Sequence, residues 1–213
     1  MKKILLIEDR VERQEKFILD TGINLETHTD ILDNQTILNK DNLFKYSIII
    51  VHRSAFGELD ENVLDFLKKY SEENKIKLVF FSGGISSTYY SNTKYEFLLL
   101  NSKSFYSKNL ELFFNEFRET NEANLLLLGY GENWRINIIL NTLSRINLFI
   151  SNNELNEKVK FNNFKTLTKI STIENIIDFE YPEEFKGTVQ LNELKSLSKQ
   201  ITKNLKRKIE LYA

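Results

Sequence analysis

The residues of this chain best suited to chemistry follow two short apolar runs. Residues 4–7 (Ile-Leu-Leu-Ile) are followed by Glu8 and Asp9, and residues 48–51 (Ile-Ile-Ile-Val) are followed by His52. Two carboxylates and an imidazole could form a metal or proton site, and imidazole titrates near neutral pH. Open α/β sheets bind ligands at the carboxyl ends of their strands. We therefore expect a site near Glu8, Asp9 and His52.

The elements that must position these residues are predicted from hydrophobic patterning. Runs of four aliphatic residues bounded by polar turns are typical of fully buried strands in a parallel sheet. Apolar residues at helical spacing predict the helices between them. We expect a three-layer α/β domain with strands at 4–7, 23–29, 46–51, 77–81 and 95–100, helices at 11–20, 61–74 and 109–118, and a short helix within 31–44.

Four positions at the predicted strand ends carry a resemblance to a known family. Besides the pair Glu8-Asp9 and His52, Ser82 follows the fourth strand and Lys103-Ser104-Phe105 follows the fifth. Over about residues 1–120, this order resembles the receiver domain of bacterial response regulators, which keep an acidic pair, a hydroxyl and a Lys-Pro-Phe motif there. The resemblance implies a flavodoxin-like (CheY-like) fold with a parallel five-stranded sheet.

The main departure from that family is His52. It stands where receivers keep the aspartate that accepts a phosphoryl group. An imidazole cannot form an acyl phosphate, and it is not the hard oxygen ligand that Mg²⁺ prefers. By resemblance the chain is a pseudo-receiver with a degenerate pocket, formed by Glu8, Asp9, His52, Ser82 and Lys103, that needs no metal or cofactor.

Each of these residues also has a structural interpretation. Asp9 could cap the helix that follows it, and Glu8 could pair with Lys103 or Arg53. His52 could be a hydrogen-bonded structural residue, a phosphohistidine or a pH-sensitive switch. The Ser82-Gly83-Gly84 turn could bind an anion through its backbone amides or could simply need glycine.

Residues 121–213 form a second region of a smaller α/β or mostly helical type. We expect strands at 124–128 and 148–150 and a helix at 133–147 between them. Residues 190–212 form a long amphipathic helix with one aliphatic stripe and several lysines between its members. The stripe could dock on its own domain, on a partner or in a dimer seam; the interaction surface that we expect comprises Phe113, Phe117, Leu194, Leu197, Ile201 and Leu205.

Composition limits the partners. The 213 residues carry a net charge of −1, so no overall field favours nucleic acid or a membrane. The absence of cysteine excludes disulfides, thiolate metal sites and a cysteine nucleophile. No apolar run has the length of a membrane span, and we expect a cytoplasmic protein.

These observations favour a non-enzymatic regulatory protein of two-component signalling type that acts through protein–protein contacts or self-association. One alternative is a transcription regulator whose basic C-terminal part binds DNA, although nucleic acid is not the partner that we expect. The other is a small enzyme that uses His52, Asp9 and Lys103. A nucleophile oriented by a base and a third group is not visible in their spacing.

Overall fold

The computed structural model describes residues 3–22, 29–32, 43–173 and 180–213. The chain divides into two compact units, Met1–Glu132 and Asn133–Ala213. We predicted a boundary after residue 120. Helix α5 (Leu125–Tyr130), however, packs against α4 (Lys108–Thr120) and β6 (Phe97–Asn101) and belongs to the first unit. The boundary therefore falls at the loop that follows α5.

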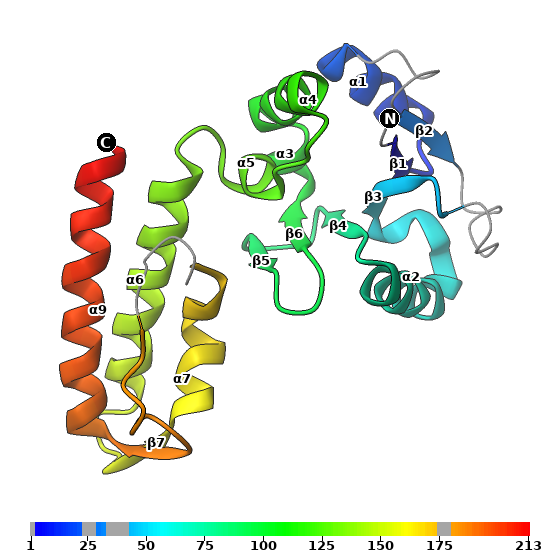
Figure 1. Ribbon diagram of the computed structural model, residues 1–213. Coiled ribbons are helices and arrows are strands. Elements are labelled where there is room, and N and C mark those ends of the chain that lie inside the picture. The colour runs from blue at the N-terminus through cyan, green and yellow to red at the C-terminus, as the bar shows by residue number, and fades with distance from the viewer. Residues whose placement is uncertain (1–2, 23–28, 33–42, 174–179) are drawn as a thin grey trace. The chain divides into compact units, whose positions relative to one another are not determined.

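A mostly parallel sheet forms the centre of the first unit (Figure 1). Its strand order is β2-β1-β3-β4-β6-β5, and every neighbouring pair is parallel except β5 with β6. The inner strands are runs of Ile, Leu, Val and Phe that the sheet buries almost completely. The strands are β1 (Lys3–Ile7), β2 (Thr29–Leu32), β3 (Tyr46–His52), β4 (Lys77–Ser82), β5 (Tyr89–Ser91) and β6 (Phe97–Asn101).

Helices cover both faces of this sheet, as the sequence predicts. Alternate side chains of the strands point to opposite faces, and those of one face form a core with α2 (Asp60–Asn74). On the other face lie α1 (Val11–Thr21), α3 (Ser102–Phe105) and α4 (Lys108–Thr120) (Figure 1). Gly22, with φ of +58°, ends α1 where we expected.

The connection between β4 and β6 departs from our prediction of alternating strands and helices. Residues 83–96 contain no helix and instead form the short strand β5, which runs antiparallel to β6 at the edge of the sheet. The sheet therefore has six strands and not five. The side chain of Asn101 holds this connection in place by donating to the carbonyl oxygens of Gly83 at 3.0 Å and Ile85 at 2.8 Å.

Two expectations for the segment before β3 need comment. We placed a strand at 23–29, of which only residue 29 lies among the described residues, and that residue begins β2. Ile31 and Leu32, which we assigned to a short helix, lie in β2 instead. Most of the remainder of that predicted helix is outside the described residues.

The surface that we expected on α4 is part of the core. Phe113 and Phe117 are 0% and 1% exposed, and Phe114 lies edge-on to Phe17 of α1 at a centroid distance of 5.3 Å. These rings hold α4 on the sheet and are not available to a partner.

The second unit consists mainly of helices. Our prediction of strands at 124–128 and 148–150 was wrong. Residues 125–128 lie in α5 of the first unit, which Asn124 caps, and residues 148–150 lie in α6 of the second. Runs of leucine fit a helix as well as a strand. No helix in the described part of the chain is both long enough and apolar enough to cross a bilayer. The elements are α6 (Trp134–Asn152), β7 (Lys158–Lys160), α7 (Phe161–Thr168), a 3₁₀ helix (Ile170–Ile173), β8 (Thr188–Gln190) and α9 (Leu191–Tyr212).

The aliphatic stripe of α9 docks on its own unit. Leu194, Leu197, Ile201 and Leu205 are at most 2% exposed, and α9 packs along α6. This agrees with the first of the three roles that we considered for the stripe. These four side chains do not form an exposed interaction surface, because the unit itself buries them.

A strand–helix repeat, which our reading of the sequence missed, organises this unit. Residues 158–169 (KVKFNNFKTLTK) and 188–199 (TVQLNELKSLSK) match at valine, asparagine, lysine and leucine positions and keep hydroxyl residues in register. Their strands pair antiparallel, with Val159 opposite Val189. Each copy therefore supplies one strand of the two-stranded sheet and the first turns of the helix that follows it.

Candidate functional site

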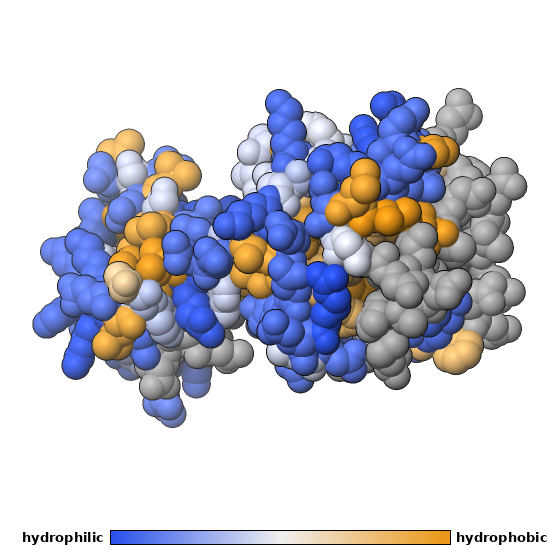
Figure 2. Space-filling view, turned by 90° about the horizontal axis from the view of Figure 1, so that it is seen from above, coloured by the Kyte–Doolittle hydropathy of each residue, from blue (hydrophilic) through white to orange (hydrophobic). Residues whose placement is uncertain are grey.

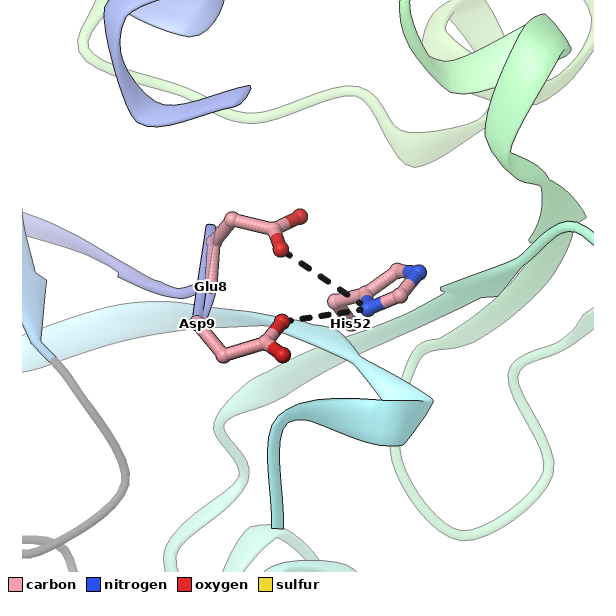
Figure 3. A group of neighbouring side chains, drawn as sticks. All are labelled: Glu8, Asp9 and His52. Carbon is pink, nitrogen blue, oxygen red and sulfur yellow. Dashed lines mark ion pairs between the residues drawn. The ribbon is translucent and has the colours of Figure 1, made fainter. Parts of the chain in front are cut away.

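Glu8, Asp9 and His52 meet at the carboxyl edge of the first unit's sheet. Because β1 and β3 are parallel neighbours with Ile7 opposite Val51, the residues that follow lie side by side. The His52 Nδ1 atom lies 3.8 Å from Glu8 Oε1 and 3.6 Å from Asp9 Oδ1, and both carboxyl groups point toward the imidazole (Figure 3). The three residues also supply one possible ligand atom each within 4.8 Å of one another.

Arg13 completes this cluster and was missed in the sequence. It lies in the first turn of α1, which begins beside the end of β1. Its Nη1 atom is 3.5 Å from Glu8 Oε1 and 2.8 Å from His52 Nε2. The guanidinium thus supplies a fixed positive charge between a carboxyl group and the imidazole. The available signal was a basic residue five positions after Glu8, the residue that follows the strand.

Further hydrogen bonds enclose the Glu8 carboxyl group. Tyr106, just after α3, donates its hydroxyl to Glu8 Oε2 at 3.2 Å, and the Arg10 backbone N–H donates to Glu8 Oε1 at 3.3 Å. The Ser54 hydroxyl lies 2.9 Å from His52 Nδ1. Glu8 is fully buried and His52 is 4% exposed. Glu8 and His52 are therefore internally bonded and have little access from solvent, whereas Asp9 and Ser54 are exposed at the edge of the cluster.

The other two predicted pocket residues do not join the cluster. Ser82 ends β4 directly after Phe81, the residue opposite His52, but its side chain takes part in none of the hydrogen bonds just described. Lys103 is exposed and forms no ion pair with Glu8 or Asp9, both of which the structure describes. Tyr106 reaches the site from this segment in its place. Glu8 pairs with Arg13 and not with Lys103 or Arg53.

The predicted helix cap at Asp9 is also wrong. Helix α1 begins at Val11 with Arg10 in the capping position, and no side chain caps it. Asp9 is one residue too early to bond the free N–H groups of the first turn. Its carboxyl group turns toward His52 instead.

The environment divides the protons of the two carboxyl groups unequally. Burial, helped by a hydrogen bond with Asp9, raises the pKa of Glu8 from 4.5 to about 7. Burial acts to raise the pKa of Asp9 too, but hydrogen bonds with Glu8 and with its own backbone hold that pKa below its usual value. Glu8 is therefore about half protonated near pH 7, and below that pH it, and not Asp9, carries the proton of the pair.

His52 is held neutral. Burial and then the positive charge of Arg13 lower the pKa of its imidazole, although the Asp9 carboxylate acts in the opposite direction. A guanidinium can only donate hydrogen bonds, so the ring nitrogen that it contacts must accept. A protonated imidazole has no such acceptor, which agrees with the lowered pKa.

Comparison with protein-family models, curated proteins and solved structures gives no match. The chemistry of this site therefore follows from its own geometry. Among the residues that the structure describes, Glu8, Asp9 and His52 form a group that could hold a metal ion, and their mixed oxygen and nitrogen donors suit Zn²⁺ better than Mg²⁺. Any cation would have to displace the Arg13 guanidinium from His52 and Glu8. As it stands, the site does not fit Mg²⁺.

Replacement of Glu8 by Gln should make the first unit less sensitive to pH. A carboxyl group with a raised folded-state pKa binds its proton more tightly in the folded state, so stability falls as pH rises from about 4.5 to about 7. The wild-type unit should lose about 3 kcal/mol relative to Glu8→Gln across this range. The lowered pKa of His52 acts with the opposite sign below pH 6.5, but it is present in both proteins and cancels in the difference.

Urea unfolding at pH 4.5 and pH 8, followed by far-ultraviolet circular dichroism, measures this difference. Fluorescence of Trp134 serves as an internal control, because the single tryptophan lies in the second unit, which Glu8 does not belong to. A stability difference between wild type and Glu8→Gln that stays constant with pH would contradict the assigned protonation of Glu8.

Proposed function

We propose that this chain is a non-enzymatic regulatory protein whose first unit is a degenerate receiver domain. In this proposal the unit has a flavodoxin-like (CheY-like) fold, acts through contacts with protein partners and is not switched by phosphorylation. The strand order β2-β1-β3-β4-β6 supports it, because the flavodoxin-like order places the second strand at one edge and the first beside the third. The location of the cluster at the carboxyl ends of β1 and β3 also supports it.

The observation that carries the proposal is the contact between Arg13, Glu8 and His52. A phosphorylated aspartate needs a carboxylate at the end of the third strand and a divalent cation beside the acidic pair. Here an imidazole stands at the strand end, and a guanidinium provides the positive charge beside Glu8, at 3.5 Å. A side chain that is part of the fold cannot dissociate as a metal ion does, so the unit would stay in one state.

The burial of His52 argues against the enzyme alternative, although Asp9 is exposed. A substrate would have to reach His52, which is 4% exposed, and would need Lys103 nearby. Lys103 is exposed and makes no ion pair with Glu8 or Asp9; the structure describes all three residues. A neutral imidazole bonded to Arg13 and Ser54 also has little freedom to accept a proton from a substrate.

Small phosphodonors should leave the protein unmodified. We expect that incubation with acetyl phosphate or phosphoramidate and Mg²⁺ produces no phosphorylated species, because His52 is buried and already bonded and no aspartate replaces it. Intact-mass spectrometry at neutral pH, which preserves acid-labile phosphate, measures the result. A known receiver domain treated in parallel shows that the donors are active. Stoichiometric labelling at any residue of the cluster would overturn the proposal.

A further inference from the structure

A long groove runs between α6 and α9 in the second unit. The two helices lie side by side (Figure 1) and antiparallel: the Arg135 guanidinium of α6 lies over the Tyr212 ring near the end of α9. The groove has a volume of about 910 Å³ and follows α9 from Lys195 to Glu210. At 1.5 Å per residue this length is about 22 Å, or four helical turns.

The groove combines apolar and basic surfaces. Ile150 of α6 is partly exposed in the groove, and Ile146, which is 1% exposed, lies buried beneath it. Viewed from above, the second unit shows hydrophobic side chains among hydrophilic ones (Figure 2). The groove's cations recur along α9 at intervals of three or four residues, one helical turn apart, and they outnumber its two carboxylates, Glu154 and Glu210; they are Lys195, Lys199, Lys203, Lys206 and Arg207.

A buried hydroxyl in this groove has no partner. Ser198 is 5% exposed, and its Oγ atom forms no hydrogen bond with any residue that the structure describes. The equivalent residue of the other repeat, Thr168, donates to the Phe164 carbonyl oxygen at 2.7 Å. Leaving a buried polar group unsatisfied costs about 1–3 kcal/mol. Ser198 lines the groove, but its Oγ atom has less than 1 Å² of accessible surface, so a bound acceptor would reach it only if the neighbouring side chains moved.

We propose that this groove binds one acidic amphipathic helix of a partner protein. Aliphatic side chains of that helix would lie on Ile150, and its carboxylates would face the α9 lysines. One carboxylate would accept from Ser198 once the neighbouring side chains move. The site lies wholly in the second unit and does not depend on the proposed function of the first. The groove would recognise its partner by negative charge and by helical structure.

The lining favours such a helix over nucleic acid. Single-stranded nucleic acid is usually held by aromatic side chains on which bases stack, and no aromatic residue is among those described as lining the groove. A bound helix would contact the groove along its whole length, because a helix lying in a groove places apolar anchors every three or four residues.

A fluorescein-labelled synthetic helix of about four turns tests the proposal. It carries a leucine stripe flanked by glutamates, and a control peptide has lysine at every glutamate position. Fluorescence anisotropy with the full chain should show binding of the acidic helix, weakening steeply with salt, and much weaker binding of the basic one. Neutralising Lys199, Lys203 and Lys206 to Gln should weaken binding about tenfold, which is about 1.4 kcal/mol shared among three exposed ion pairs.

Matched variants separate this role from a structural one. The Lys158→Gln, Lys160→Gln, Lys186→Gln variant neutralises three equally exposed lysines of the same unit away from the groove, and it should bind like wild type. Ser198→Ala should weaken binding of the acidic helix without lowering the Trp134 unfolding midpoint, because it removes an unsatisfied hydroxyl.

Several results would overturn the proposal. Equal binding of the acidic and basic helices, or no effect of the groove variant, would contradict a basic docking site. Displacement of the acidic helix by a single-stranded oligonucleotide at lower concentration would assign the groove to phosphates instead. Dimerisation of the protein alone, abolished by the groove variant in sedimentation velocity, would show that a second copy fills it.

Discussion

Truncation after Gly187 should unfold the second unit and leave the first unit folded. The deletion removes β8 and α9, and with them side chains that the rest of the unit buries almost completely. Burial of each aliphatic side chain stabilises by roughly 1.5–3 kcal/mol, so the loss is on the order of 10 kcal/mol. That is comparable with the whole stability of a domain. The lost side chains include Leu191, Leu194, Leu197, Ile201 and Leu205.

The single tryptophan makes this result easy to measure. Trp134 begins α6, which α9 covers, so its cooperative unfolding transition should disappear in the truncated protein. The circular dichroism transition of the first unit should remain. Truncation after Glu210 is the matched control, because it removes mostly exposed residues such as Leu211, and it should change little. A truncated protein that kept the Trp134 transition would show that α9 docks elsewhere.

The engineered removal of Arg13 and His52 is the second change with a large expected effect. In the Arg13→Ala, His52→Asp protein, three carboxylates would face one another at the ends of β1 and β3, and no guanidinium would neutralise them. Like charges at this distance cannot all remain ionised without a cation. Oxygen ligands suit Mg²⁺, so we expect the double variant to bind it in the millimolar range or tighter.

The single variants serve as controls for this gain. His52→Asp alone should not bind Mg²⁺, because Arg13 would remain beside Glu8 and pair with the new carboxylate. Arg13→Ala alone should not bind it either, because His52 supplies nitrogen in place of the third oxygen ligand. Binding by either single variant would show that only one of the two residues blocks the site.

The sheet could be predicted from the sequence because its inner strands are unbroken aliphatic runs. Burial on both faces leaves β1, β3 and β4 without polar alternation, and this pattern is hard to confuse with a surface helix. The edge strand β5 was harder to predict. Strand β5 has three residues, and its pairing with β6 depends on a connection held by Asn101, a contact between residues distant in sequence. The leucine run of α5 fits helix and strand equally well.

The candidate site could also be predicted only in part. Strand ends that are neighbours in a parallel sheet bring Glu8, Asp9 and His52 together, and the sequence reveals that arrangement. The residues that decide its chemistry come from helices. Arg13 reaches back from α1, and Tyr106 rather than Lys103 reaches in beside α3. Such contacts depend on where each helix begins and which side it turns to the sheet, and neither follows from local patterning.

The central claim is that Arg13 and His52 exclude a divalent cation from the first unit. A titration of the wild-type chain with Mg²⁺, followed by the backbone amide signals of Glu8, Asp9 and His52 in ¹H–¹⁵N NMR spectra, tests it directly. We predict no saturable shift in the wild-type protein and saturable shifts of these signals in the Arg13→Ala, His52→Asp variant. Saturable shifts at these three amides in the wild-type protein would contradict the claim.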